Sequence, residues 1–485
     1  MKPGAGNMAL GQPWTRVSYR SRRPSAFAAV ALSLGLAPTV SAQQPPAPAP
    51  AHMPGQAASQ TPAAQTPSRL SLREVVALAL KNNLSVRVAG TQVEEAGGTR
   101  LRQRSALEPR VTSDAYANLQ DRNLQALGFS FPGFPIPLTT GAFGTYDFRV
   151  FAQQPVVDRQ AYHSYQSSKR QLDAAKLTYQ DTRDLVIRQA AGYYLDAQAA
   201  AAEVQAAEAR VITSRALEQL ARDQHSAGVA TRVDLLRAQV QLQRDQQNLL
   251  VARDNYETAL LVLQRYLGLR PGAPLELAEQ LEFRSTAPPE PDEALRTALE
   301  ARADYRSLRA QREALVEQQK ASRARYLPKL SINGDYGVFG RDFGQMPAIG
   351  QIQGTVTFTV FDRDRKGEQQ EIASRLQRVD AQIADLERGI EQELRKAELD
   401  LQSAEQQVAV TKAAVDLADE ELKLAEDRFR NGVTDNIEVI TAQGSLQSAQ
   451  DDHITALARH SDARMALARA LGATEQGYEN YLGPK

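Results

Sequence analysis

The sequence predicts a mainly α-helical, internally duplicated chain, in which four β-strands contribute to a membrane β-barrel and long antiparallel helices form coiled coils. Three observations predict this fold: a repeat at a fixed offset, two pairs of alternating segments, and long stretches without proline. The chain has 485 residues, and its length alone would suggest several ordinary domains. Because the repeat runs through most of the chain, it is the stronger guide.

Residues 1–42 are expected to be an export signal. A basic stretch at 16–23 precedes an apolar run at 26–37, and the Val-Ser-Ala sequence at 40–42 provides the small residues that a signal peptidase reads. The apolar run is too short to span a bilayer, which takes about 20 helical residues. The segment 43–69 is rich in Pro, Ala and Gln, so we expect it to be a disordered leader.

Charge and composition exclude several classes of function. The first 42 residues hold five basic side chains and no acidic one, which leaves 52 basic against 57 acidic side chains beyond them. This balance provides no broad cationic field for nucleic acid. The chain has no cysteine, and it lacks the motifs of a nucleophile elbow, a phosphate-binding loop, a zinc protease or a dinucleotide site. We therefore expect no enzyme activity, no metal and no cofactor.

Two parts of the sequence repeat each other. Residues 228–239 match residues 432–443 at an offset of 204, and the same offset relates 157–159 to 361–363. Further upstream the offset becomes 219, so one connection is 15 residues longer in the first copy. The resulting boundaries are 70–268 for the first copy, 269–291 for a linker, 292–472 for the second copy and 473–485 for a tail.

Each copy opens with a helix that leads into a β-hairpin. In the second hairpin apolar and polar side chains alternate, whereas Ser113 and Gln154 interrupt the apolar face of the first. Lipid outside and water inside would explain this pattern, although a soluble sheet would also show it. Predicted bounds are 71–106 and 292–325 for the helices and 109–157 and 328–361 for the hairpins. Aromatic residues expected in an interfacial girdle are Phe129, Phe131, Phe134, Phe143, Tyr146, Phe148 and Phe151.

Long helices follow each hairpin, because no proline interrupts these parts of the sequence. Residues 160–225 predict one helix of roughly 98 Å at 1.5 Å per residue. A turn at Gly228 leads to a helix over 231–268, which we expect to stack end to end on the helix 292–325 with the linker at the joint. The Ala- and Gln-rich composition suits a coiled-coil wall, with a soluble rod-like bundle as the alternative.

Four strands are too few to close a barrel. Closure takes about eight strands or more, so it requires two copies for eight strands or three copies for twelve, and only the larger barrel leaves a wide lumen. No stretch beyond the export signal is apolar enough for a helical membrane span, so a crossing would have to use the strands. The sequence therefore predicts a tube with strands at one end and helices at the other.

Three sequence features point to a family. They are the Leu-Arg-Glu-Val-Val-Ala-Leu-Ala-Leu-Lys-Asn-Asn segment at 72–83, the Leu-Pro-Lys-Leu at 327–330 that begins a strand, and the two Gly-Val turns with the Ala-Gln pairs after them. On these residues, and over about 70–472, the chain resembles the TolC-like outer membrane efflux proteins. It differs from the lipoprotein branch of that family, because no cysteine follows the export signal.

The resemblance implies a homotrimer with one twelve-stranded barrel in the outer membrane of a Gram-negative-type envelope, continued by an α-helical tunnel in the periplasm. It implies three kinds of partner: outer-membrane lipid, a periplasmic membrane-fusion adaptor, and the inner-membrane transporter of a tripartite efflux or type I secretion system. The implied function is passive export of the substrates that this transporter hands over, and their identity stays open. The alternative is a soluble periplasmic coiled-coil scaffold or adaptor.

The turns that end the long helices carry the candidate functional residues. Gly228 and Gly432 precede Val229 and Val433, and a left-handed helix cap is sufficient to explain both glycines. The resemblance implies that these turns form the periplasmic entrance, where the adaptor docks. Flanking residues expected to hold the entrance shut are His225, Arg232, Arg428 and Phe429. Solvation or packing at a helix end is the simpler explanation for each of those four.

Asp234 and Glu438 lie six residues after the two tip glycines. Thr231-x-x-Asp234 and Asp435-x-x-Glu438 have the spacing of capping boxes, which would make both acids helix caps. The resemblance implies instead that the two acids narrow the closed entrance. A trimer would then place six carboxylates near its axis, where they would favour cations. Capping and a selectivity ring stay open as alternatives, and one residue could serve both.

Overall fold

The computed structural model describes residues 68–124, 126, 128, 133, 137–287, 289–475 and 477–478. These residues belong to one of the two compact units of the chain, residues 64–485. The expected export signal, and all but the last two residues of the expected leader, lie outside the described residues. The same holds for Phe129, Phe131 and Phe134 of the expected aromatic girdle.

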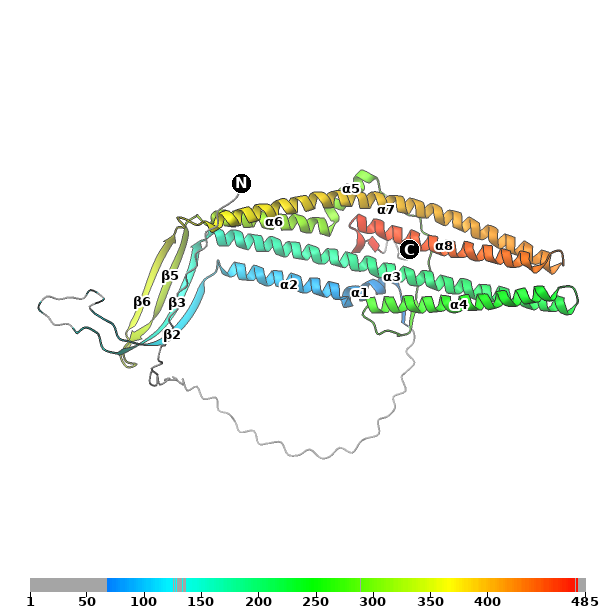
Figure 1. The fold of residues 1–485 in the computed structure, drawn as a ribbon. Helices are drawn as coiled ribbons and strands as arrows, with labels where there is room; N and C mark the ends of the chain where they lie inside the picture. The colour runs from blue at the N-terminus through cyan, green and yellow to red at the C-terminus, as the bar shows by residue number, and fades with distance from the viewer. Residues whose placement is uncertain are drawn as a thin grey trace, which may run out of the picture. The chain divides into compact units, whose positions relative to one another are not determined.

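Two similar series of elements follow each other along the chain (Figure 1). The first consists of β1 (Ser68–Leu70), α1 (Leu72–Asn82), α2 (Leu84–Ser105), β2 (Arg110–Gln120), β3 (Phe143–Val157), α3 (Arg159–Ser226) and α4 (Arg232–Tyr266). The second consists of β4 (Leu275–Leu277), α5 (Pro291–Ala301), α6 (Ala303–Ala324), β5 (Lys329–Gly340), β6 (Ala348–Thr357), α7 (Asp364–Arg430) and α8 (Asn436–Ala470). The predicted mainly α-helical, duplicated chain with four hairpin strands is confirmed.

The opening helix of each repeat is broken, so the prediction of continuous helices over 71–106 and 292–325 is wrong. Asn83 lies between α1 and α2 with extended backbone angles (φ −63°, ψ 133°), and Arg302 lies between α5 and α6 with φ −60° and ψ 123°. Asn83 caps α2, because its Oδ1 accepts a hydrogen bond of 2.9 Å from the Ser85 amide. Arg302 gives no such local signal, since arginine is a good helix former.

The helices that run back from the turns at Gly228 and Gly432, α4 and α8, are the return helices, and they end at these two breaks. Asn82 donates a hydrogen bond of 2.9 Å from Nδ2 to the carbonyl oxygen of Leu267, at the end of α4. At the end of α8, a Cβ atom on Gly472 would lie 2.9 Å from the backbone nitrogen of Arg302, so a larger residue would force the helix ends apart. Each return helix therefore stacks on the opening helix of its own repeat. The prediction that the first return helix stacks on the second opening helix is wrong.

The central helix of this unit is α3. It contacts α2 and α6 near the strands, where His163 Nδ1 lies 2.8 Å from a carboxylate oxygen of Glu317, and it contacts α4 and α8 near the turns at Gly228 and Gly432 (the tip turns). Because α7 contacts α6 and α8, the order is α2–α3–α6–α7 near the strands and α4–α3–α8–α7 near the tips (Figure 1). This order leaves α2, α4 and α7 at the edges. Among the described residues, no helix has both the length and the apolar content to cross a membrane.

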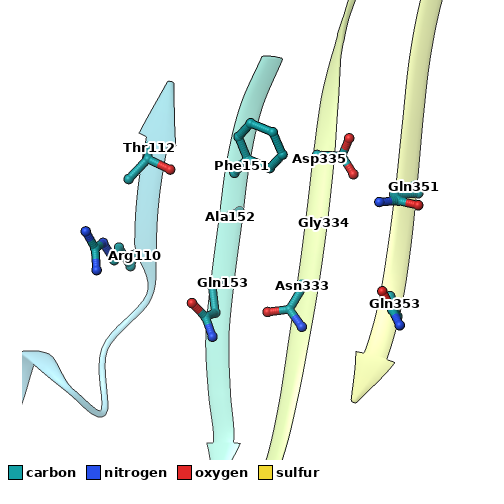
Figure 2. A pocket seen from close by; sticks show the side chains of 10 residues that line it. All are labelled: Arg110, Thr112, Phe151, Ala152, Gln153, Asn333, Gly334, Asp335, Gln351 and Gln353. Carbon is teal, nitrogen blue, oxygen red and sulfur yellow. The ribbon is translucent and has the colours of Figure 1, made fainter. Parts of the chain in front are cut away.

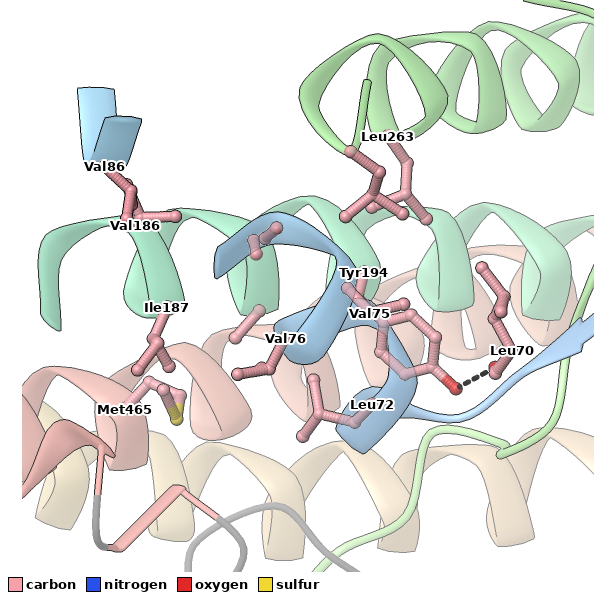
Figure 3. Packing of buried hydrophobic residues seen from close by; sticks show 14 of the residues in the cluster. Leu70, Leu72, Val75, Val76, Val86, Val186, Ile187, Tyr194, Leu263 and Met465 are labelled. Carbon is pink, nitrogen blue, oxygen red and sulfur yellow. Dashed lines mark hydrogen bonds between the residues drawn. The ribbon is translucent and has the colours of Figure 1, made fainter. Parts of the chain in front are cut away.

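A hydrophobic core joins the helices of both repeats at the level of the breaks (Figure 3). Val75 of α1, Ile187 of α3, Leu263 of α4 and Met465 of α8 are each 1 % exposed or less. Tyr194 is also buried, and its hydroxyl donates a hydrogen bond of 3.3 Å to a carbonyl oxygen of β1. Burying side chains of this size contributes about 1.5–3 kcal/mol each, so this core fixes the level at which the helices meet.

The end of the expected leader and the linker form a small parallel sheet. Leu70 of β1 pairs with Leu277 of β4, and both Leu70 and Leu275 are buried. The prediction of disorder is therefore wrong for residues 68–69, which belong to β1. A three-residue strand whose partner lies about 200 residues away leaves no periodic signal in the sequence.

The remaining strands form an antiparallel sheet in the order β2-β3-β5-β6, in which β3 and β5 join the two repeats. The register places Tyr116 opposite Asp147 and Phe151 opposite Asp335, all on one face. Figure 2 shows part of this polar face, where a pocket of about 300 Å³ lies among polar side chains of neighbouring strands. Exposed apolar side chains of the opposite face are Val111, Leu119, Phe148, Val150, Ile332, Tyr336, Ile352 and Val356.

Charged side chains are also buried at the level where α4 and α8 meet the breaks in the opening helices, which we call the joint. The Arg302 side chain is 2 % exposed and binds Asp304 at 2.7 Å. Burial alone would raise the pKa of Asp304, but hydrogen bonds from Arg302 and the charges of Arg302 and Arg469 lower it below its usual value. For Asp184 the balance is reversed: burial raises its pKa to about 6, against the charge of Arg469 and a backbone hydrogen bond from Glu475.

The raised pKa of Asp184 predicts a pH-dependent stability. Between about pH 4 and pH 6 the unfolded chain loses a proton that the folded chain keeps, so stability present at low pH is lost as the pH rises. Asp184→Asn removes the charge, and it should raise the melting temperature of the detergent-solubilised protein near neutral pH by a few degrees, with little change near about pH 3.5, where the folded and the unfolded chain both mostly hold the proton. Melting curves of both proteins at both pH values test this. Lower stability of the variant at both values would show that the charge is needed.

Candidate functional site

The two long helices end in turns of the same geometry. Gly228 has a φ of +76° and Gly432 a φ of +67°. The amides of Val229 and Val433 each donate a hydrogen bond of 2.9 Å to the carbonyl five residues earlier, and each glycine amide donates one of 3.0 Å to the carbonyl three residues earlier. This pattern is a Schellman motif, and its left-handed residue explains why both positions are glycine.

The two turns lie against each other. A Cβ atom on Gly432 would lie 4.0 Å from Cγ1 of Val229, and Gln224 donates a hydrogen bond of 3.2 Å from Nε2 to the carbonyl oxygen of Phe429. All four helix ends also share a hydrophobic cluster, so they form one packed group. Its buried members are Leu217, Ala221, Ala238, Leu422, Ala425, Phe429, Val439 and Ala442.

Asp234 forms the expected capping box. Its Oδ2 accepts hydrogen bonds of 2.6 Å from the Thr231 hydroxyl and 3.1 Å from the Thr231 amide, and its own amide donates one of 3.3 Å to Thr231 Oγ1. The Arg237 guanidinium lies 3.6 Å from the carboxylate, and the Asp234 side chain is only 9 % exposed. This carboxylate is therefore occupied by groups of its own chain.

Glu438 forms no capping box, so the prediction from Asp435-x-x-Glu438 is wrong. Asp435 caps α8 by accepting a hydrogen bond of 3.3 Å from the Ile437 amide. The Glu438 carboxylate instead binds the Arg428 guanidinium of α7 at 2.8 Å, and the two side chains are 37 % and 55 % exposed. The longer glutamate side chain reaches the neighbouring helix, and it stays accessible where Asp234 does not.

The other expected gate residues differ in their surroundings. His225 is exposed, and its Nδ1 lies 3.2 Å from the Ala230 carbonyl oxygen within the same turn. Arg232 is exposed and forms no ion pair with any described residue. Phe429 is 3 % exposed and packs in the cluster below the turns, as a helix-end packing residue would.

Asn436 was not expected from the sequence. It is fully buried, and its Nδ2 donates a hydrogen bond of 2.5 Å to the Asp234 carbonyl oxygen, which ties α8 to α4. In the repeat it stands at the position of Arg232, so the broken symmetry between the two copies was the signal that could have found it.

A groove between α4 and α8 was also not expected. It has a volume of about 350 Å³ and opens beside the tip turns. Exposed apolar side chains that line it are Val233, Leu236, Val240 and Ile437. The spacing of three and four residues along α4 is the sequence signal of such an apolar stripe.

A model of the family described as outer membrane efflux protein matches residues 75–269 and 294–473, which coincide with the two repeats. The chain belongs to the outer membrane efflux protein family. The resemblance inferred from the duplicated sequence is thereby confirmed.

Similar proteins agree with this assignment. The efflux protein is 25 % identical over 417 residues to the toluene efflux pump outer membrane protein TtgC of Pseudomonas putida, with 83 % of each chain covered. Its structure is similar to that of the outer-membrane channel OprN, with a TM-score of 0.70, 20 % identity, and coverage of 83 % of this chain and 90 % of that one. For the CmeC outer membrane channel of Campylobacter jejuni the TM-score is 0.71 at 16 % identity, with 84 % and 89 % covered.

The coarse function follows from the family. The protein is an outer-membrane component of an efflux system. The alternative of a soluble periplasmic scaffold or adaptor is not supported, because the family model that matches both repeats is that of outer membrane efflux proteins. The fold that they share with this chain combines strands with long helices, as the sequence predicts.

The capping box predicts a local loss of stability at the tip. Thr231→Val keeps the shape of the side chain but removes the hydroxyl, so it should cost about 1 kcal/mol and speed amide exchange in the first turn of α4. Thr231→Ser keeps the hydroxyl and is the matched control, for which exchange should stay near that of the wild type. Hydrogen–deuterium exchange of peptides from this turn measures both variants. Equal protection in the two variants would rule out the capping role.

Proposed function

We propose that three copies of this efflux protein close into one duct, with a twelve-stranded barrel in the outer membrane and a helical tunnel in the periplasm. The duct passively conducts substrates that a periplasmic adaptor and an inner-membrane transporter deliver. The observation that supports this most is that both edges of each chain are unfinished and complementary. Three sheets of four strands give twelve, which leaves a lumen wide enough for transport.

The first unfinished edge is α4, which packs along α3. Ala238 and Asp245 are buried against α3, where Asp245 accepts a hydrogen bond from the Ser214 hydroxyl. A step of two residues turns about 200° around a helix, so Val240 lies on the side away from α3. Exposed apolar members of this outer stripe are Val233, Leu236, Val240, Leu250 and Leu261.

The second unfinished edge is α7. Its buried side chains, among them Val408 and Leu422, face α8, and another apolar stripe lies on the opposite side. Val410, Leu417 and Leu424 are 69 %, 68 % and 59 % exposed and stand seven residues apart, which is the spacing of a coiled-coil seam. Because α4 and α7 run in opposite directions from the same tip level, α7 of one copy can pack against α4 of the next. Head-to-tail contacts of this kind close into a ring when the rotation between neighbouring copies is a whole fraction of a turn, which is one third for three copies.

The sheet is also unpaired at both of its edges. Its edge strands are β2 and β6, so β6 of one copy can pair with β2 of the next. The strands have 10 to 15 residues, and a tilted transmembrane strand takes about 9–11 residues. Leu119, Tyr336 and Ile352 on the apolar face are 75 %, 70 % and 86 % exposed, which suits contact with lipid. The polar face of Figure 2 would then line the lumen.

The assembly would gather the tip turns around one opening. We assign Glu438 as the entrance carboxylate, because it is accessible, and Asp234 chiefly as a helix cap, because its carboxylate is buried and engaged. Arg428 holds Glu438 and partly neutralises it, and Arg232 is the exposed cation beside the first turn. We assign His225 to the shape of that turn.

The adaptor would dock on the turns themselves. Val229 and Val433 are 68 % and 67 % exposed, so each Schellman turn presents an apolar side chain to solvent. Gly228 and Gly432 set that geometry, and Phe429 supports it from below. The substrate class stays open, because nothing in the tip geometry selects one.

The accessibility of the two acids predicts how ion selectivity divides between them. In planar bilayers Glu438→Gln should lower the preference for cations by roughly twofold or more, measured as the reversal potential in a salt gradient, because it removes three accessible carboxylates from the ring. Asp234→Asn should leave the reversal potential close to wild type and reduce thermal stability. Selectivity that follows Asp234 alone would reverse the assignment, and channels unaffected by either change would remove the selectivity ring.

The exposed stripe on α7 predicts the oligomeric state of its variants. Leu417→Lys places a charge in the proposed seam between copies, so association in detergent should weaken about tenfold or more, which corresponds to roughly 1.4 kcal/mol per contact. Ile212→Lys on the central helix α3 is a matched control, because Ile212 and Leu417 are both 68 % exposed. Size-exclusion chromatography with light scattering measures both variants. Equal trimer content in the two would argue against the seam.

A further inference from the structure

Two copies of a short sequence follow the two hairpins. Residues 157–159 are Val-Asp-Arg, and residues 361–363 are Phe-Asp-Arg. In each copy a basic residue close to the start of β5 binds the aspartate: Lys329 Nζ lies 3.3 Å from Asp158, and the Arg325 guanidinium lies 2.7 Å from Asp362. The role of each aspartate is therefore explained by contacts within the chain.

The arginine that follows each aspartate has no such explanation. Arg159 and Arg363 are exposed, and neither guanidinium forms an ion pair or a hydrogen bond within the part of the chain that the structure describes. Both stand at the start of a long helix, α3 or α7, where the helix dipole disfavours a cation. Neither helix stability nor a local contact accounts for the repeated arginine.

The strand register shows which face of the sheet the end of β3 presents just before Arg159. Lys329 is on the polar face, since it stands two residues before Ser331 and four before Asn333. Because Asp158 points to Lys329, Val157 before it points to the apolar face, and Arg159 follows as the first residue of α3. Val157 agrees with this, as it pairs with Leu330 of that face.

Exposed apolar or aromatic side chains lie close in sequence to both arginines. Val157 is 44 % exposed and Phe361, its counterpart in the second repeat, is 82 % exposed. One turn along each helix are Tyr162, which is 50 % exposed, and Lys366, which is also exposed. Basic and aromatic side chains beside an apolar surface are the combination found where a membrane protein meets lipid headgroups.

We propose that Arg159 and Arg363, assisted by Lys366, bind the phosphate of anionic phospholipid headgroups in the leaflet that meets the helical end of the barrel. This inference rests on the proposed function, which puts the apolar face of the sheet in contact with lipid. One arginine from each repeat gives this surface a preference for anionic over zwitterionic phospholipid. In a ring of three copies the six arginines form a collar at one level of the wall.

Titration of the detergent-purified trimer with phosphatidylglycerol or phosphatidylcholine, read by native mass spectrometry, tests this collar. The wild type should bind phosphatidylglycerol more tightly than phosphatidylcholine. Arg159→Gln/Arg363→Gln should weaken binding of phosphatidylglycerol about fivefold for each arginine, or about 25-fold for the pair, and leave phosphatidylcholine binding unchanged. Inorganic phosphate at equal concentration should not displace the lipid, because it lacks the acyl chains that contact the apolar face.

Arg215→Gln/Arg378→Gln is the matched control, since these arginines are exposed on the same two helices and form no ion pair with a described residue. The control should keep the affinity of the wild type for phosphatidylglycerol. Equal binding of the two lipids by the wild type, an equal loss in both double variants, or displacement by inorganic phosphate would each overturn the proposal. Trimer content and bilayer conductance of the same samples report separately on the proposed duct, so failure of one can be told from failure of the other.

Discussion

Edge strands β2 and β6 leave a row of backbone N–H and C=O groups unpaired within the described sheet, and the core of a bilayer offers no water to pair them. The edge helices have the same incompleteness, since α4 and α7 each expose an apolar stripe on the side away from their neighbours. Both deficits occur on the same two edges of the chain. A second copy can satisfy them together, which is why the proposed duct depends on this one constraint.

Duplication gives each chain two equivalent hairpins and two equivalent tip turns, and the joint holds them at fixed levels. At that joint α4 and α8 end against breaks in the opening helices of their own repeats. The buried core around Tyr194 and the ion pairs of Arg302 then fix the helices relative to one another. Sheet and tip turns are therefore held at opposite ends of the same helices, which a duct that joins a membrane to a periplasmic partner requires.

The sequence was sufficient for features that depend on local chemistry. The tip glycines, the long uninterrupted helices and the alternating strands each follow from residue type and spacing. Features that depend on distant contacts could not be derived in this way. The break at Arg302 lies where Gly472 approaches its backbone, and the β1–β4 pair joins segments that are far apart in the chain. Likewise, two sequences with the spacing of a capping box form different contacts. The Glu438 carboxylate binds Arg428 on another helix, whereas the Asp234 carboxylate accepts a hydrogen bond from Thr231 in its own capping box.

The contact between α7 of one copy and α4 of the next is the central claim. Because the chain has no cysteine, Val240→Cys and Leu424→Cys introduce its only thiols, and α3 and α8 separate these two positions within one chain. On a non-reducing gel the account predicts bands up to a covalent trimer, which a reductant reverses and which the control pair Ile212→Cys and Leu424→Cys lacks. A monomer band alone, or a trimer band from the control pair as well, would contradict the account.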